Sequence, residues 1–263
     1  MMSSMASARY AAPAVDFVSA YARAAAEFLA AVPSGDMAAR VPACPGWSTY
    51  DLVVHLGNVH AWAATIVETG ARAPEQNDHP PSHRPKSVAR WYAAKAEDLY
   101  QVLRDADGDA ACWTFSAAHH TEAFWPRRQT HETLVHLVDL HQASGSTPEV
   151  PAVLAADGIA EVFEVFLPRM HERGRPAELV AQTLVHAADT GDTWLLSPSD
   201  EGPPEVGRVD GADLVVRGAD LLAGPAVDLM LMLWKRLPAD HAGASLDGDR
   251  DRLLALLRSP LTP

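Results

Sequence analysis

The 263-residue chain is 48% hydrophobic and 21% charged, a composition typical of globular proteins. Its formal charge of -13, from 21 basic and 34 acidic residues, argues against general nucleic-acid binding, because that binding needs clustered lysine and arginine. Its two cysteines are too few for a disulfide framework or a four-thiolate zinc site, so any metal must be held by nitrogen and oxygen.

The sequence also indicates the location of the protein and the number of its domains. No apolar run approaches the roughly 18 residues that cross a bilayer, and the N-terminus MMSSMASARYAAP lacks the basic-then-apolar order of a signal peptide. We therefore expect a cytoplasmic protein with no membrane or nucleic-acid partner, and we take a monomer as the working expectation. The length allows one large domain or two modest ones.

The first 170 residues carry the apolar periodicity of helices. Ser48 is expected to cap the second helix, with Asp51 completing a capping box and Gly70 ending the helix. Ser87 is the expected cap of the third helix, and Pro126 falls in the first turn of the fourth. The expected helices cover 14–32, 48–70, 87–107, 126–145 and 151–170, with a loop at 71–86.

Beyond about residue 175 the pattern changes to short runs broken by Gly, Pro and Asp, which predict strands. The candidate strands lie within 178–189, 193–199, 207–211 and 213–220, and helices are expected over 224–238 and 249–260. The sequence thus predicts an α+β protein with an N-terminal helical bundle, residues 1–174, and a smaller C-terminal α+β domain, residues 175–263.

The segment HETLVHLVDLH, residues 131–141, raises the question of a metal site. The zinc-protease pattern HExxH fails here, because its second histidine would stand at the position of Val135. On a helix, however, Glu132 and His136 are about 40° apart and one turn from each other, so they can share an ion. His131 points elsewhere, and Asp139 could support a ligand.

A catalytic zinc site needs a third protein ligand, which must come from another helix. In DLVVHLGNVH, His55 lies among apolar residues and is the better candidate, because His60 is about 140° away on the helical wheel. At this point the alternatives remain open: each histidine could be a hydrogen-bonded core residue, and Glu132 could be a solvated helix acid. Cys44 in CPGW could be a nucleophile, but the Pro-Gly turn explains that segment without one.

Three blocks together resemble a known family. VPACPGWSTYDLVVHLGNVHAWA, WPRRQTHETLVHLVDLHQASG, and DLVVRGADLLAGPAVDLMLMLWKRLP followed by LDGD are similar in order and spacing to the mycothiol-dependent maleylpyruvate isomerase family. The resemblance implies an N-terminal DinB-like four-helix bundle joined to a C-terminal domain related to sterol carrier proteins.

The resemblance also implies chemistry. It assigns zinc or another divalent ion to His55, Glu132 and His136, and it makes Arg236 a candidate catalytic residue that reaches toward substrate carboxylates or the thiol. The implied activity is isomerisation or thiolation of a small electrophile with mycothiol as cosubstrate. The alternative is a non-enzymatic module that binds a metal or a small ligand.

Overall fold

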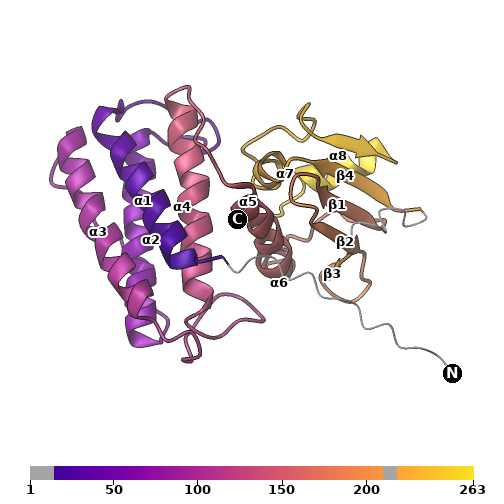
Figure 1. Ribbon diagram of the computed structural model, residues 1–263, viewed down its shortest axis with the longest axis horizontal. Helices are drawn as coiled ribbons and strands as arrows, with labels where there is room; N and C mark the ends of the chain where they lie inside the picture. The colour runs from indigo at the N-terminus through magenta and orange to yellow at the C-terminus, as the bar shows by residue number, and fades with distance from the viewer. Residues whose placement is uncertain (1–14, 210–217) are drawn as a thin grey trace.

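A computed structural model describes residues 15–209 and 218–263. The N-terminal half is a bundle of four long helices, in which α1 lies against α4 and α2 lies against both α3 and α4 (Figure 1). A single turn of 3-10 helix, Val32–Ser34, follows α1. The four helices are α1 Phe17–Ala31, α2 Thr49–Thr69, α3 Pro85–Asp105 and α4 Phe124–Ala143. The predicted bundle is therefore confirmed.

Helix α2 begins and ends where its capping residues predict. The Ser48 side chain accepts from the Asp51 amide, and the Asp51 carboxylate accepts from the Ser48 amide, so the capping box is complete. Gly70 follows the last turn with a left-handed φ of 65°, which a glycine adopts without steric strain. These two ends fix the helix that carries His55.

Helix α3 starts earlier than predicted, and Ser87 is not its cap. The helix begins at Pro85, whose fixed φ and missing amide suit the first helical position. Arg84 is the N-cap residue, and the Ser87 amide already donates to the Arg84 carbonyl inside the first turn. The expected loop at 71–86 is correspondingly two residues shorter.

The helix expected over 151–170 is divided into three segments. It consists of α5 Ala152–Glu161, a π-helical turn over Val162–Phe166, and α6 Leu167–Glu172. Pro168 lies in the first turn of α6 and has no amide hydrogen to donate to the preceding helical turn. The π-helical turn of five residues comes directly before α6.

The C-terminal part contains a five-stranded sheet of order β3-β2-β1-β4-β5. β1 runs parallel to β4, and the other neighbours are antiparallel. The elements are β1 Thr183–Ala187, β2 Thr193–Ser197, β3 Glu205–Arg208, β4 Asp220–Gly224, α7 Ala226–Leu233, β5 Ser245–Asp247 and α8 Arg250–Arg258. Residues 210–211 of the strand expected at 207–211 and residues 213–217 of the strand expected at 213–220 lie outside the described residues. β4 begins at Asp220. β5 was not expected.

Helix α5 packs against α7 and so lies with the sheet rather than with the bundle (Figure 1). The division predicted between residues 174 and 175 stays a prediction. The connection 144–151 leads from α4 to α5.

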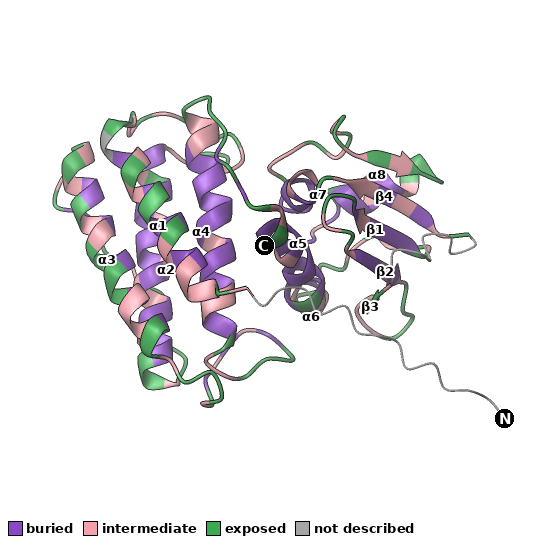
Figure 2. Cartoon of the chain, viewed as in Figure 1, coloured by how far each residue is buried: buried purple, intermediate pink, exposed green. Residues whose placement is uncertain are grey.

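One cluster of buried side chains extends through both parts of the chain, and the helices of the bundle turn their buried faces inward (Figure 2). Its largest members include Tyr21, Phe28, Tyr92, Trp125 and Trp194. Within the described residues, no helix combines the length and the apolar character needed to span a membrane.

Candidate metal centre between the bundle and the C-terminal part

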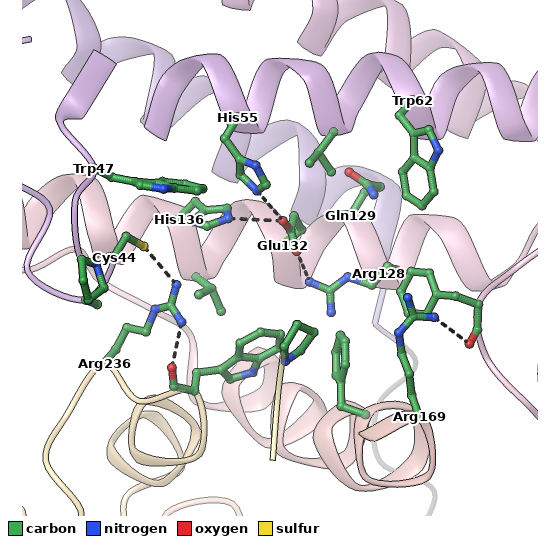
Figure 3. A pocket seen from close by; sticks show the side chains of 18 residues that line it. Cys44, Trp47, His55, Trp62, Arg128, Gln129, Glu132, His136, Arg169 and Arg236 are labelled. Atoms are coloured by element: carbon green, nitrogen blue, oxygen red, sulfur yellow. Dashed lines mark hydrogen bonds and ion pairs between the residues drawn. The ribbon is translucent and has the colours of Figure 1, made fainter. Parts of the chain in front are cut away.

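A pocket of about 550 Å³ lies where the bundle meets the C-terminal part (Figure 3). Helices α2 and α4 form one wall with His55, Glu132 and His136, while Trp234 and Arg236 come from the end of α7 and beyond it. The site therefore draws on segments almost two hundred residues apart, which only the folded chain brings together.

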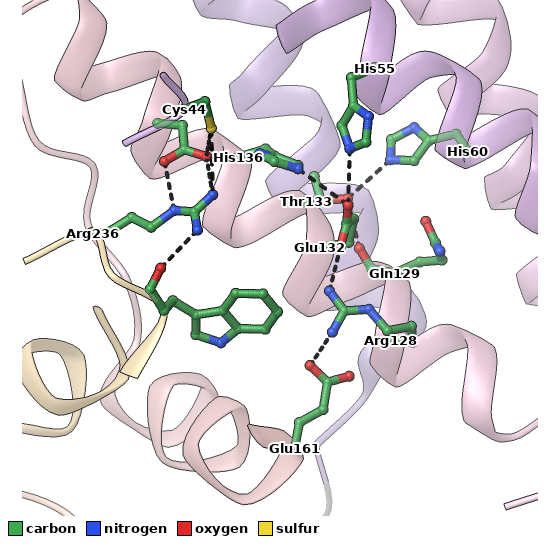
Figure 4. A network of polar contacts seen from close by, with 12 residues as sticks. Cys44, His55, His60, Arg128, Gln129, Glu132, Thr133, His136, Glu161 and Arg236 are labelled. Carbon is green, nitrogen blue, oxygen red and sulfur yellow. Dashed lines mark hydrogen bonds and ion pairs between the residues drawn. The ribbon is translucent and has the colours of Figure 1, made fainter. Parts of the chain in front are cut away.

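The structure brings the three predicted metal ligands together. One donor atom from each of His55, Glu132 and His136 lies within 4.8 Å of the other two. The Glu132 Oε1 atom is 3.2 Å from His136 Nε2 and 3.6 Å from His55 Nε2 (Figure 4). His55 keeps 37% of its side chain exposed, so it faces the pocket and not the core.

Glu132 is held as a carboxylate. Burial alone would raise its pKa, but the charge of Arg128 and the hydrogen bonds from His136 and His55 outweigh burial and hold the pKa well below its usual range. The strongest contact is the 2.6 Å ion pair between Arg128 Nη2 and Glu132 Oε2, which leaves Oε1 directed at the two imidazoles.

His136 is oriented by Asp139, one turn further along α4. The Nδ1 atom of His136 lies 2.8 Å from Asp139 Oδ2, and this contact leaves Nε2 on the pocket side. Burial lowers the pKa of His136, but its bonds to Asp139 and Glu132 raise the pKa to about 9. A carboxylate on the far nitrogen is the usual support of a metal-binding histidine, and the expected role of Asp139 fits this position.

Arg236, the candidate that the resemblance implied, lines the pocket from the C-terminal part. Its Nε and Nη2 atoms donate to the two Asp139 oxygens at 2.9 and 2.8 Å, and Nη1 donates to the Trp234 carbonyl at 2.8 Å. Arg236 therefore both lines the pocket and holds Asp139 in position.

Cys44 and Trp47 of the CPGW turn also line the pocket. The Cys44 Sγ atom lies 3.7 Å from Asp139 Oδ2 and 3.8 Å from Arg236 Nη2. Burial first, and the Asp139 charge second, raise the pKa of Cys44 to about 11, which disfavours the thiolate that a nucleophile needs. The Trp47 ring packs 4.8 Å from the His55 ring.

Two nearby histidines do not join the cluster, as the helical wheel predicted. His60 is fully buried between the Tyr21 hydroxyl at 3.3 Å and the Thr133 hydroxyl at 3.1 Å. Burial lowers its pKa to about 3, so it is a neutral core residue. His131 contacts Asp157 at 2.7 Å on another face of α4.

Several pocket residues were missed in the sequence. Arg128 is buried between Glu132 and Glu161, the latter from α5 in the C-terminal part (Figure 4). The four-residue spacing of Arg128 and Glu132 was a readable signal for their pairing. Gln129 and Arg169 gave no such signal, because their neighbours in the pocket come from distant segments.

This arrangement offers two nitrogens and one oxygen to a single ion on the wall of a hollow large enough for small molecules. Such a donor set, with at least one coordination position left open, is typical of catalytic zinc. Arginines at either side of the cluster make the pocket suitable for anionic ligands.

Two family models match the chain. The model described as mycothiol maleylpyruvate isomerase N-terminal domain covers residues 18–141, and the one described as MDMPI C-terminal domain covers residues 153–255. The gap between the models coincides with the connection from α4 to α5.

Solved structures agree in fold. Two crystal structures superpose on this chain, one of a mycothiol-dependent maleylpyruvate isomerase and one of its mutant in which a histidine is replaced by alanine. Each has a TM-score of 0.59 and 11% sequence identity. The alignment covers 88% of this chain and 91% of theirs. No curated protein matches the chain significantly in sequence.

Proposed function

The chain belongs to the mycothiol maleylpyruvate isomerase family, and from this premise we propose that it is a metal-dependent enzyme that uses mycothiol to isomerise or thiolate a small electrophile. The single observation that carries the proposal is the convergence of His55, Glu132 and His136 within 4.8 Å on the wall of a 550 Å³ pocket. Hollows of this size accommodate small substrates.

The residues present fit a divalent ion. His55 and His136 would each offer Nε2, and Glu132 would offer Oε1. Both Glu132 and His136 are fixed from behind, by Arg128 and by Asp139, so the donors are ordered before an ion arrives. Two imidazoles and a carboxylate suit zinc, although other ions of similar preference fit the same set.

A bound divalent ion would lower the pKa of a thiol at the open position, which supplies thiolate near neutral pH. Trp47 covers one side of the cluster. In the protein itself, burial and the Asp139 charge raise the pKa of Cys44 to about 11 and disfavour its thiolate, which supports an external low-molecular-weight thiol as the nucleophile.

The same site serves two outcomes. Addition of the thiol sulfur to one carbon of a cis double bond leaves a single bond that can rotate, and loss of the same thiol returns it and gives the trans isomer. If the adduct instead leaves the pocket, the reaction is a thiol transfer. We propose that Arg236 orients a substrate carboxylate or the thiol with the Nη1 hydrogen that the Trp234 carbonyl does not accept.

The test is turnover by metal-loaded protein with mycothiol and a panel of electrophiles that includes maleylpyruvate, followed by chromatography of the products. We expect isomerised or thiolated product from wild type and His60→Leu, and none from His55→Ala. His60 is the matched control, because it lies on the same helix as His55 but in the core. Metal binding without turnover of any electrophile would favour the non-enzymatic binding module.

A further inference from the structure

A second hollow, of about 790 Å³, adjoins the candidate metal centre. The two hollows share Trp62, Phe115 and Arg169, so they meet at the end of the pocket opposite Arg236 (Figure 3). Arg72 and Arg173 line the rest of this second hollow, and we call it the arginine groove after Arg72, Arg169 and Arg173.

The arginine groove is positive in a chain of net charge -13. Its three guanidinium groups share the lining with one acid, Glu75. Across residues 15–209 and 218–263, no carboxylate lies within the 4.0 Å ion-pair distance of any of the three. Most arginines that border the metal pocket are instead paired: Arg128 with Glu132 and Glu161, and Arg236 with Asp139.

Two of the three guanidinium groups are held in place by aromatic rings. Arg169 lies 4.2 Å from the Phe115 ring centroid and donates through Nη1 to the Phe115 carbonyl at 3.1 Å. Arg72 lies 5.6 Å from the Trp113 ring centroid. A guanidinium that rests on a ring keeps N–H donors at its edge, and a planar fork of such donors matches a carboxylate.

The charge on Arg169 is only partly compensated, by the neighbouring Glu172. Burial first, and the neighbouring Arg173 second, lower the pKa of Arg169. An anion in the groove would oppose both effects, since it would supply the missing negative charge next to a half-buried cation.

We propose that the arginine groove binds the carboxylate end of an organic anion whose other end reaches the cluster of His55, Glu132 and His136. The second half of this statement rests on the proposed function, whereas binding of a carboxylate in the groove does not. The site selects for substrates that carry a carboxylate remote from the reacting carbon, and Arg169, at the junction of the two hollows, is the residue that sets this selectivity.

The experiment measures the binding of maleate, a small dicarboxylate, to the zinc-loaded full-length protein by tryptophan fluorescence, to which Trp62 and Trp113 of the groove contribute. Monomethyl maleate, with one charge removed, is the matched ligand. The variants are Arg169→Gln and Arg72→Gln. Arg258→Gln is the control, because it removes the same charge from the exposed end of α8.

We expect each groove variant to raise the Kd for maleate about tenfold, because it loses one charge-assisted hydrogen-bonded pair. The Kd of Arg258→Gln should stay within about twofold of wild type. Monomethyl maleate should bind more weakly than maleate. Arg72 is exposed, so its variant gives a result even if Arg169→Gln misfolds. Unchanged affinity in Arg72→Gln, or an equal loss in Arg258→Gln, overturns the proposal.

A repeat with His136→Ala protein separates this proposal from the proposed function. Retained maleate binding that still depends on Arg72 supports the groove even if no electrophile is turned over. Maleate binding that disappears with His136 and ignores Arg72 places the anion at the metal centre and refutes the groove, whatever the outcome of the turnover assay.

Discussion

Asp139 and Arg236 form a two-pronged ion pair, 2.9 and 2.8 Å long, that joins helix α4 to the segment after α7. The same carboxylate accepts from Nδ1 of His136. Asp139 therefore links a residue of the C-terminal part to a candidate metal ligand, and the geometry of that ligand depends on contacts across the junction.

Asp139→Asn is expected to weaken zinc binding about 10- to 100-fold, because the amide supports the imidazole less well than the carboxylate. Competition with a chromophoric chelator measures the affinity. Unfolding in urea, followed in parallel, shows whether the variant is still folded. Zinc affinity equal to that of wild type in a folded variant would mean that His136 needs no support from Asp139.

Arg128→Met should destabilise the protein by about 3–5 kcal/mol, since it leaves the buried Glu161 and the partly buried Glu132 without their shared cation. Only 3% of the Arg128 side chain is exposed, so solvent cannot replace the lost pairing. Urea denaturation at pH 7 measures the free energy of unfolding. Arg258→Gln, which removes the same charge from the surface, is the control. An equal loss of unfolding free energy in the two variants would contradict a stabilising role for the Arg128 ion pairs.

Cys44 should resist alkylation. With a pKa of about 11, compared with about 8.5 for a free thiol, its thiolate fraction at pH 7.5 is lower by roughly two orders of magnitude. The rate with iodoacetamide, measured in a Cys112→Ala background, should be correspondingly slow and should rise as the pH approaches 11. Alkylation as fast as that of a free cysteine would return Cys44 to the list of candidate nucleophiles.

His60 should make folding stability sensitive to acid. The folded chain keeps His60 neutral down to about pH 3, whereas the unfolded chain protonates it near pH 6.5. The unfolded state therefore binds the additional proton in this interval, so stability falls as the pH drops from 6.5, by up to about 1.4 kcal/mol per unit. Urea titrations at several pH values should give a flatter curve for His60→Leu, and curves of identical slope would refute the assignment.

Much of this site was accessible to helical geometry. Glu132 and His136 share a face because four residues make about one turn, and the wheel correctly separated His60 from His55. Local rules also placed Ser48 and Gly70 at the ends of α2. The prediction that Ser87 caps α3 was wrong, because Pro85, two residues earlier, begins the helix. The capping pattern alone did not take this proline into account.

The rest depended on tertiary structure. Glu161 contacts Arg128 because α5 packs near α4, and Arg169 lines the pocket because α6 follows α5. No local sequence pattern predicts this packing. The parallel pairing of β1 with β4 joins strands more than thirty residues apart, so their periodicity could indicate strands but not their order.

X-ray absorption at the zinc edge of the reconstituted protein tests the metal centre most directly. We predict two imidazole nitrogens and a carboxylate oxygen at about 2.0–2.2 Å, with a sulfur at about 2.3 Å appearing only after mycothiol is added. His136→Ala should lose one imidazole or the ion itself. A spectrum that shows no protein-derived imidazole, or one unchanged by the loss of His136, would contradict the assignment.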